Sequence, residues 1–223
     1  MHVNFHKHYY AMSGLSLKRG SFVFLFCCSL FSPNVVAKPQ NYLEQIAIFW
    51  QTLYPSGGTD LYCGQRFGKY DRGYNIEHVM PMAWVKKELK CGTRKQCRER
   101  SARFNQIEMD MHNLYPSDKG ANHERLAYAF AEIPGEKWWR EGCDLEIDKH
   151  KRLAEPREAV RGDIARAALY MEERWGIPIY QRQRSLLLRW HLEDPPDSHE
   201  RWRNDQIEAY QGNRNPWIDG QRP

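Results

Sequence analysis

The octapeptide YNIEHVMP, residues 74–81, is the stretch around which the rest of the sequence can be interpreted. The run YNIEHV is typical of a short strand, and Pro81 marks where a strand gives way to a loop. Glu77 and His78 are chain neighbours, so on a regular strand their side chains point to opposite faces. A carboxylate and an imidazole at a strand end raise the question of what both could contact.

The first 37 residues differ from the rest of the chain. Lys18 and Arg19 precede the apolar run SFVFLFCCSLF at 21–31, and small residues follow up to Ala37. This pattern predicts a signal peptide at 1–37 and a mature domain at 38–223. The apolar run is shorter than the roughly 20 residues that span a membrane. We therefore expect an exported protein, periplasmic or secreted, with no membrane attachment after cleavage.

Lipidation at Cys27 or Cys28 is the less favoured alternative. Phe26 is bulky where a lipoprotein signal has a small residue.

Four of the six cysteines lie beyond the predicted cleavage position. They are Cys63, Cys91, Cys97 and Cys143. In an exported chain they predict two disulfides, with three alternative pairings. Cys91 and Cys97 bracket a short glycine-containing loop, which favours a bond between them and leaves Cys63 with Cys143. A zinc site is the alternative, but it would favour closer pairs such as C-x₂-C, which this sequence lacks.

The hydrophobic pattern predicts one α+β domain that is mostly helical. The chain has 223 residues and 41% apolar residues, enough for one core. Helices are expected at 41–54, 117–132, 158–175, 183–194 and 199–210. Strands are expected at 59–63, 74–79 and 109–115. For the first helix, the apolar stripe predicted to face the core is Leu43, Ile46, Ala47, Trp50, Leu53 and Tyr54.

Positive charge is concentrated soon after the opening octapeptide. The chain has a formal net charge of +5, and eight basic residues lie between Lys86 and Arg103 against two acidic ones. A solvated face is the simplest interpretation. The position of this basic segment soon after Glu77 and His78 also suits a polyanionic substrate, because Lys and Arg bind phosphates whatever the sequence of the polymer.

Hydrolysis of a phosphodiester gives Glu77 and His78 complementary tasks. A water must lose a proton, for which a neutral imidazole is suited. Negative charge on the phosphate and the leaving oxygen must be stabilised, for which Mg²⁺ held by one or two oxygen ligands is suited. Glu77 can supply one ligand and Asn122 a second, and an arginine fork can hold the phosphate. The alternative is that His78 is a hydrogen-bonded core residue and Asn122 an ordinary helix residue.

Several motifs in order resemble the bacterial endonuclease I family. They are YNIEHVMP, RKQC at 94–97, DMHNLYPS at 110–117, Asn122 with Arg125, and QGNRNPWI at 211–218. The resemblance runs from about residue 42 to about residue 218. It implies a periplasmic or secreted nonspecific nuclease with a ββα-metal (His-Me finger) element.

The resemblance also implies roles for individual residues. His78 is the general base, Glu77 and Asn122 hold a single Mg²⁺ ion that Mn²⁺ or Ca²⁺ can replace, and Arg94 binds the scissile phosphate. Asn113 orders the loop that presents the histidine, and His112 belongs to the same motif. Substrate contacts are expected from Lys86, Lys87, Lys95, Arg98 and Arg125.

The resulting expectation is a monomeric, Mg²⁺-dependent endonuclease that acts on DNA and RNA without sequence preference. Two alternatives remain. A secreted nucleic-acid-binding protein would retain DNA without cutting it, and a phosphodiesterase for small substrates would not prefer long chains.

Overall fold

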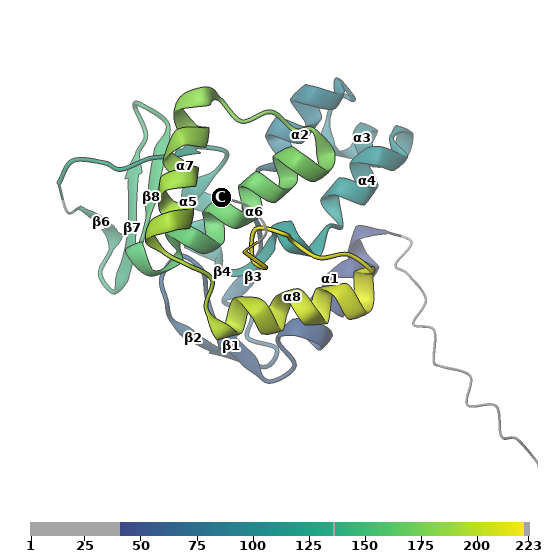
Figure 1. Ribbon diagram of the computed structural model, residues 1–223, viewed down its shortest axis with the longest axis horizontal. Coiled ribbons are helices and arrows are strands. Elements are labelled where there is room, and N and C mark those ends of the chain that lie inside the picture. The colour runs from purple at the N-terminus through teal and green to yellow at the C-terminus, as the bar shows by residue number, and fades with distance from the viewer. Residues whose placement is uncertain (1–40, 136, 221–223) are drawn as a thin grey trace, which may run out of the picture. The chain divides into compact units, whose positions relative to one another are not determined.

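The predicted strand at the opening octapeptide forms, and it pairs with a strand far along the chain. The computed structural model describes residues 41–135 and 137–220. Strand β3 (Tyr74–His78) runs antiparallel to β4 (Leu114–Asp118), with Glu77 opposite Tyr115 and His78 opposite Leu114. Helix α5 (Lys119–Arg125) follows β4 directly and contacts both strands. This two-strand and one-helix unit lies at the centre of the described chain (Figure 1).

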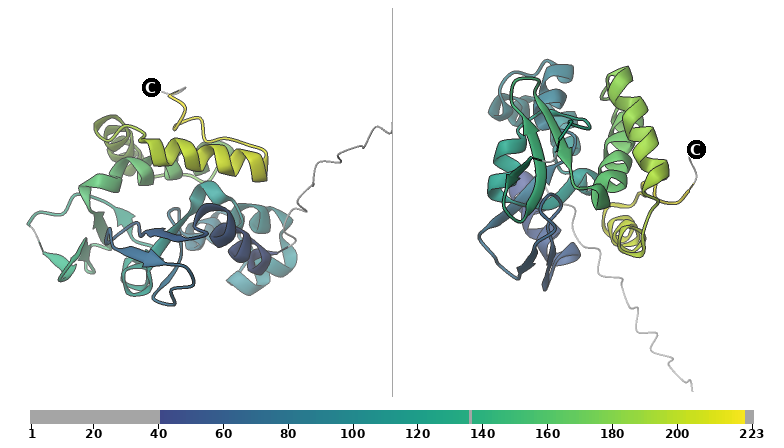
Figure 2. Two further views of the ribbon diagram at one scale, coloured as in Figure 1. Left: turned by 90° about the horizontal axis from the view of Figure 1, so that it is seen from below. Right: turned by 90° about the vertical axis from the view of Figure 1, so that its left-hand side faces the viewer.

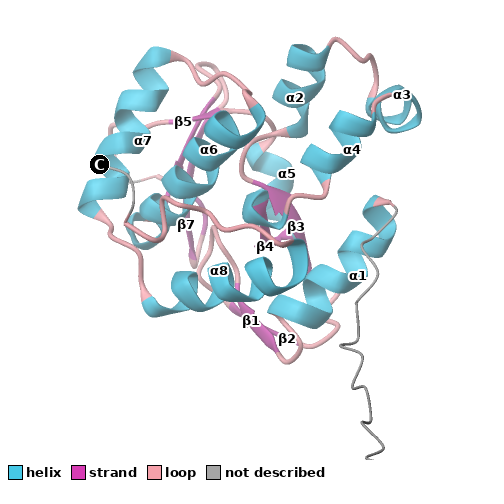
Figure 3. Ribbon diagram, turned by 45° about the vertical axis from the view of Figure 1, so that its right-hand side comes forward, coloured by secondary structure: helices cyan, strands magenta, loops and turns pink. Residues whose placement is uncertain are grey.

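The connection from β3 to β4 contains the basic segment. It forms helices α2 (Met82–Leu89), α3 (Arg94–Arg100) and α4 (Ala102–Glu108), then the 3₁₀ turn η1 (Met111–Asn113). Thr93 begins α3 with a capping box, in which its side chain and that of Gln96 satisfy each other's backbone N–H groups. The three helices contact one another and lie to one side of the strand pair (Figure 3). The connection therefore carries positive charge to the His78 end of β3.

Both predicted disulfides are present. Cys91–Cys97 joins the end of α2 to α3, with Cα atoms 4.9 Å apart. Cys63–Cys143 links positions 80 residues apart, with Cα atoms 4.1 Å apart. The pairing favoured by loop length is confirmed.

Two further sheets flank the central unit. A short hairpin pairs β1 (Gly57–Thr59) with β2 (Arg66–Gly68). A four-stranded sheet has the order β5-β8-β7-β6, in which only the β5–β8 pair is parallel. Its strands are β5 (Ala129–Phe130), β6 (Trp138–Arg140), β7 (Cys143–Asp148) and β8 (Leu153–Pro156). Strands of two to six residues carry little sequence periodicity, and this sheet was not predicted.

The C-terminal third is helical, as predicted. The helices are α6 (Arg161–Trp175), preceded by the turn η2 (Glu158–Val160), then α7 (Gln181–Glu193) and α8 (Ser198–Gln211). Helix α6 ends at Gly176, which adopts φ +64° where a side chain would be strained. Both views in Figure 2 show these helices as one layer over the remaining elements. The described residues thus form a mixed α+β structure, as expected, and they contain eight α-helices where five were predicted.

The face that α1 (Tyr42–Leu53) buries was predicted only in part, since Leu53 and Tyr54 of the expected stripe are buried. Gln45, Phe49 and Leu53 are buried, whereas Leu43 is 75% exposed. The helix packs along an i, i+4, i+8 line that includes a polar residue, and an apolar stripe cannot reveal such a line.

Two of the three predicted strands also differ. Residues 61–63 form a turn, because the Asp60 carboxylate accepts the backbone N–H groups of Cys63 and Gln65. The strand expected at 109–115 starts only at Leu114, because Asp110 caps the η1 turn.

The helix expected at 117–132 is shorter than predicted and has a different cap. Asp118, not Ser117, accepts the first backbone N–H groups, and the helix ends at Arg125 because Leu126 turns to φ +52°. The predicted signal peptide lies outside the described residues. Among the helices that are described, none is long and apolar enough to cross a bilayer.

Candidate active site

His78 is the last residue of β3 and is held in one tautomer. Its side chain is buried, and Nε2 lies 3.0 Å from the backbone oxygen of Glu108. A carbonyl oxygen can only accept, so Nε2 carries the hydrogen and Nδ1 keeps a lone pair. Burial, followed by the positive charge of Arg94, lowers the pKa of His78 to about 4. The imidazole is therefore neutral near pH 7, the form that accepts a proton.

Glu108 connects His78 to the basic segment, a role that sequence reasoning missed. Its carboxylate is buried and accepts from Arg94 Nε at 2.5 Å and from Arg98 Nε at 2.7 Å and Nη2 at 2.9 Å. Its backbone oxygen holds His78. One residue thus fixes the imidazole and two guanidinium groups, while 43% of the Arg94 side chain stays exposed.

Tyr42, also not predicted, covers the same group of side chains. Its ring centroid lies 5.4 Å from that of His78. The guanidinium carbons of Arg94 and Arg98 lie 5.4 Å and 5.0 Å from the Tyr42 ring. The first turn of α1 therefore meets His78 and the two arginines.

Glu77 lies on the other side of β3 with a separate set of partners. Tyr62 donates its hydroxyl to Oε1 at 2.7 Å, and Arg125 Nη1 lies 2.9 Å from the same oxygen. Burial raises the pKa of the Glu77 carboxyl, and Arg125 and the Tyr62 hydrogen bond oppose that rise. Adjacent residues on β3 thus present an imidazole and a carboxylate on opposite faces. A phosphate at the end of the strand could be flanked by both.

Asn122 lies close to the backbone beside Glu77. Its amide nitrogen donates to Asn75 Oδ1 at 2.9 Å and to the Ile76 carbonyl at 3.2 Å. Both contacts use the amide nitrogen, so the single side-chain oxygen of Asn122 is not used in them, and the contacts of Glu77 with Tyr62 and Arg125 both use Oε1. Hard cations such as Mg²⁺ prefer one or two oxygen side chains and keep several waters. Within the described ranges no group of three His, Cys, Asp or Glu side chains could hold a metal.

Arg125 was expected to contact substrate, but its side chain lies in the interior of the structure. Its side chain is 1% exposed, and it donates to the backbone oxygens of His78 at 3.3 Å and Val79 at 2.7 Å besides pairing with Glu77. Its guanidinium carbon also lies 4.4 Å from the Phe130 ring centroid. The predicted role in substrate binding is inconsistent with this burial. Arg125 instead attaches α5 to the end of β3.

Asn113 holds the backbone that follows β3 through its side chain. Its side-chain oxygen accepts from Met80 N at 2.7 Å, and its amide nitrogen donates to Met80 O at 3.0 Å. Asn113 is fully buried. It therefore clamps the chain two residues after His78.

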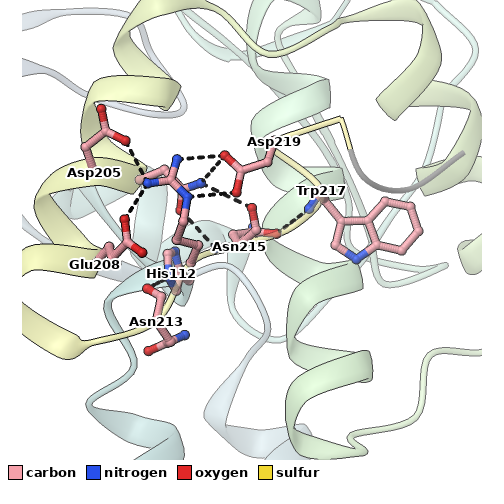
Figure 4. Close-up of polar contacts among 9 residues, drawn as sticks. His112, Asp205, Glu208, Asn213, Asn215, Trp217 and Asp219 are labelled. Carbon is pink, nitrogen blue, oxygen red and sulfur yellow. Dashed lines mark hydrogen bonds and ion pairs between the residues drawn. The ribbon is translucent and has the colours of Figure 1, made fainter.

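His112 contacts the C-terminal segment and α6. Its Nε2 lies 3.1 Å from the backbone oxygen of Asn213, and its ring centroid is 4.6 Å from that of Tyr170. Figure 4 shows His112 beside Asn213, below a cluster that includes Asp205, Glu208 and Asp219. Those three carboxylates surround Arg214, each 2.7 Å from one of its Nη atoms. The QGNRNPWI motif at 211–218 thus packs against η1, and His112 is one of the η1 residues that contact it.

The remaining predicted substrate contacts lie on the basic helices. Lys86 and Lys87 are in the last turn of α2, and Lys95 and Arg98 are on α3 with Arg94. Lys95 is 86% exposed and only loosely paired with Glu99, at 3.9 Å. The structure brings Arg94 and Arg98 to His78 through Glu108 and leaves Lys87 and Lys95 on the surface.

For the phosphodiester hydrolysis expected from the sequence, we expect Glu108→Gln to lower the rate roughly 10- to 100-fold, the worth of charge-assisted hydrogen bonds. The amide keeps the shape and the backbone oxygen that holds His78, but it no longer aligns Arg94 and Arg98 as an anion. Single-turnover cleavage rates measure the effect. Glu99→Gln, which removes one negative charge from the exposed part of the same segment, is the matched control. Equal effects of the two changes would mean that net charge, not alignment, is responsible.

The chain resembles known proteins along most of its length. A protein-family model described as Endonuclease I matches residues 39–222. A periplasmic deoxyribonuclease of Aeromonas hydrophila is 40% identical over 149 residues, which are 65% of this chain and 62% of that protein. An extracellular deoxyribonuclease of the same organism is 37% identical over 166 residues, 71% of this chain and 72% of its own length.

A more distant relative is named as a ribonuclease. An extracellular ribonuclease of Bacillus subtilis is 33% identical over 164 residues. The match covers 66% of this chain but 51% of that protein. This chain therefore spans less than two thirds of the first relative named above and about half of this one.

Proposed function

Because this chain belongs to the Endonuclease I family, we propose that it is an exported endonuclease that hydrolyses phosphodiester bonds in DNA and also in RNA. The relatives named as periplasmic and extracellular deoxyribonucleases and as an extracellular ribonuclease support both substrates and the location. Residues 1–37 direct export and are removed, and the mature chain at 38–223 acts as a monomer.

The single observation that carries this proposal is the geometry around His78. A neutral imidazole is fixed through Nε2 by the Glu108 carbonyl, and the same residue's carboxylate holds Arg94 and Arg98. A base beside two phosphate-binding side chains is the minimum for attack on a phosphodiester. We propose that Nδ1 of His78 takes the proton from the attacking water, while Arg94 orients the phosphate in its fork.

The metal-binding part of the proposal rests on Glu77 and Asn122. They would hold one Mg²⁺ ion through the second oxygen of the carboxylate and the amide oxygen. When bound, the ion supplies positive charge that stabilises the phosphate and the leaving oxygen. Tyr62 and Arg125 favour the ionised form of the carboxylate against the effect of burial and orient it. Strands β3 and β4 with α5 then correspond to the ββα-metal element expected of the family.

The test of function is cleavage of closed circular plasmid by the exported, oxidised protein in Mg²⁺ and in EDTA. An endonuclease nicks or linearises the circle in Mg²⁺ only. Linear duplex DNA and single-stranded RNA assayed in parallel define the substrate range. Retention of DNA without cleavage in every condition would favour the binding-protein alternative. Turnover of small phosphodiesters without preference for long chains would favour the phosphodiesterase alternative.

We expect Glu77→Gln to raise the Mg²⁺ concentration for half-maximal cleavage by at least about 10-fold, since it replaces the charged ligand with a neutral one of the same shape. A Mg²⁺ titration of the cleavage rate measures this. Glu124→Gln, which changes a partly buried carboxylate of α5 that pairs with Lys149, is the control. An unchanged Mg²⁺ requirement would remove Glu77 from the metal site.

A further inference from the structure

An aromatic cleft of about 940 Å³ lies next to the candidate active site and has no role in the reaction described above. We define it by six of its lining residues: Trp50, Tyr54, Phe67, Tyr70, Tyr74 and Lys119. They come from α1, the β1–β2 hairpin, the loop after it, and the first residues of β3 and α5. Figure 3 shows α1 and the hairpin beside the β3–β4 pair.

The walls of the cleft are ring faces and edges. The centroids of Phe67 and Tyr74 are 4.9 Å apart with planes tilted by 35°, and those of Trp50 and Phe67 are 5.8 Å apart and nearly perpendicular. Trp50 and Tyr74 are only partly buried, so part of their ring surface faces the opening. A wall of this kind favours a flat apolar occupant.

The rim of the cleft is cationic. Lys69, Arg72 and Lys119 line it together with a single acid, Asp71, whose Oδ1 already accepts the Gly73 N–H. Tyr70 is 85% exposed, and Lys69 Nζ lies 4.9 Å from the centre of its ring. An exposed ring beside a cation contributes little to folding and is available to a ligand. The charges match a phosphate-bearing ligand with an aromatic part.

The cleft shares two elements with the candidate site. Tyr74 precedes Glu77 by three residues on β3, about 10 Å along a strand. Lys119 begins the helix that carries Asn122 one turn later. A strand of nucleic acid with one phosphate at the His78 end could therefore place a nearby nucleotide in the cleft.

We propose that the aromatic cleft is a subsite for an unpaired base of the nucleic-acid strand being cut. This inference rests on the proposed function and extends it to strand preference. Bases within a duplex are stacked and expose only their edges, whereas an unpaired base offers a face to Trp50, Tyr70 or Tyr74. The cationic rim holds the phosphates on either side of that base. The subsite gives the protein a preference for single-stranded segments.

The test measures binding without cleavage, in the His78→Ala form of the exported protein, to a short DNA single strand and to the duplex of the same sequence. Stacking of one base on an aromatic side chain corresponds to at least about a 5-fold effect. We expect Tyr70→Ala and Trp50→Leu each to weaken single-strand binding by this factor more than duplex binding. Trp50→Phe, which keeps a ring, retains most of the affinity.

Matched controls separate the cleft from surface aromatics in general. Tyr180→Ala removes a tyrosine that is 70% exposed on another part of the surface, and it should change neither affinity. A second control uses single strands that each carry an abasic nucleotide at a different position. At one of these positions the missing base should abolish the effect of Tyr70→Ala on binding. Tyr70 is exposed, so this variant stays informative if Trp50→Leu lowers stability.

Two results would overturn the subsite. One is equal weakening of single-strand and duplex binding by Tyr70→Ala and Trp50→Leu, and the other is no weakening by either. The same preparations with His78 restored are assayed on plasmid in Mg²⁺. If plasmid is cleaved but the cleft variants do not selectively weaken single-strand binding, only the subsite is contradicted. Selective base binding without any cleavage would contradict only the nuclease function.

Discussion

His78→Ala should lower the rate of plasmid cleavage by about 10²- to 10⁴-fold, the usual contribution of a general base. The imidazole is the group at the β3 end that can accept a proton near neutral pH. It is fixed through Nε2 to the Glu108 carbonyl, with its lone pair on Nδ1. Alanine removes the acceptor but leaves Arg94, Arg98 and the surface lysines in place. DNA binding should therefore persist while cleavage is lost.

His123→Ala is the control for this prediction. His123 lies exposed on α5, one residue after Asn122. The substitution therefore removes an imidazole close in sequence to the candidate site and leaves the proposed base unchanged. Its cleavage rate should match that of the unchanged protein. Circular dichroism and DNA affinity establish that the His78→Ala form is folded and binds. If that form cleaves at the unchanged rate, another group is the base.

Much of the site could be predicted because its residues lie close together in sequence. The strand with Glu77 and His78 and the Cys91–Cys97 loop each depend on neighbours within a few positions. Turn and strand preferences act over this range. The long C-terminal helices were also predictable, since fifteen residues of α6 carry a clear 3.6-residue pattern.

The partners that position the site could not be predicted in this way. Glu108 acts partly through its backbone oxygen, which any residue has, and Tyr62 and Tyr42 reach the site only after the chain folds. The role of Arg125 could not be predicted from sequence either. In sequence it is one more basic residue beside a metal-ligand candidate, and only its 1% exposure distinguishes an internal ion pair from a phosphate contact. Pairings between distant segments determine these roles.

Arg125→Met should destabilise the protein by about 3–5 kcal/mol, the cost of leaving one member of a buried ion pair without its partner. Methionine fills the space of the aliphatic stem, so the loss comes mainly from the guanidinium group. That group pairs with Glu77 and donates to the Val79 carbonyl, and both would be left buried. Urea unfolding of the oxidised protein measures the change. Lys149→Met, which breaks an exposed pair with Glu124 on α5, should leave the midpoint nearly unchanged.

A double variant separates the ion pair from the other contacts of Arg125. In Glu77→Gln with Arg125→Met no charge remains buried at this point of β3, so part of the lost stability should return even though both native side chains are gone. If the double variant is instead less stable than Arg125→Met alone, the hydrogen bonds to the end of β3 matter more than the charge of Glu77. Recovery would mean that Arg125 compensates a carboxylate that folding must bury. The chain keeps that costly carboxylate at the position where the proposed reaction needs a metal ligand.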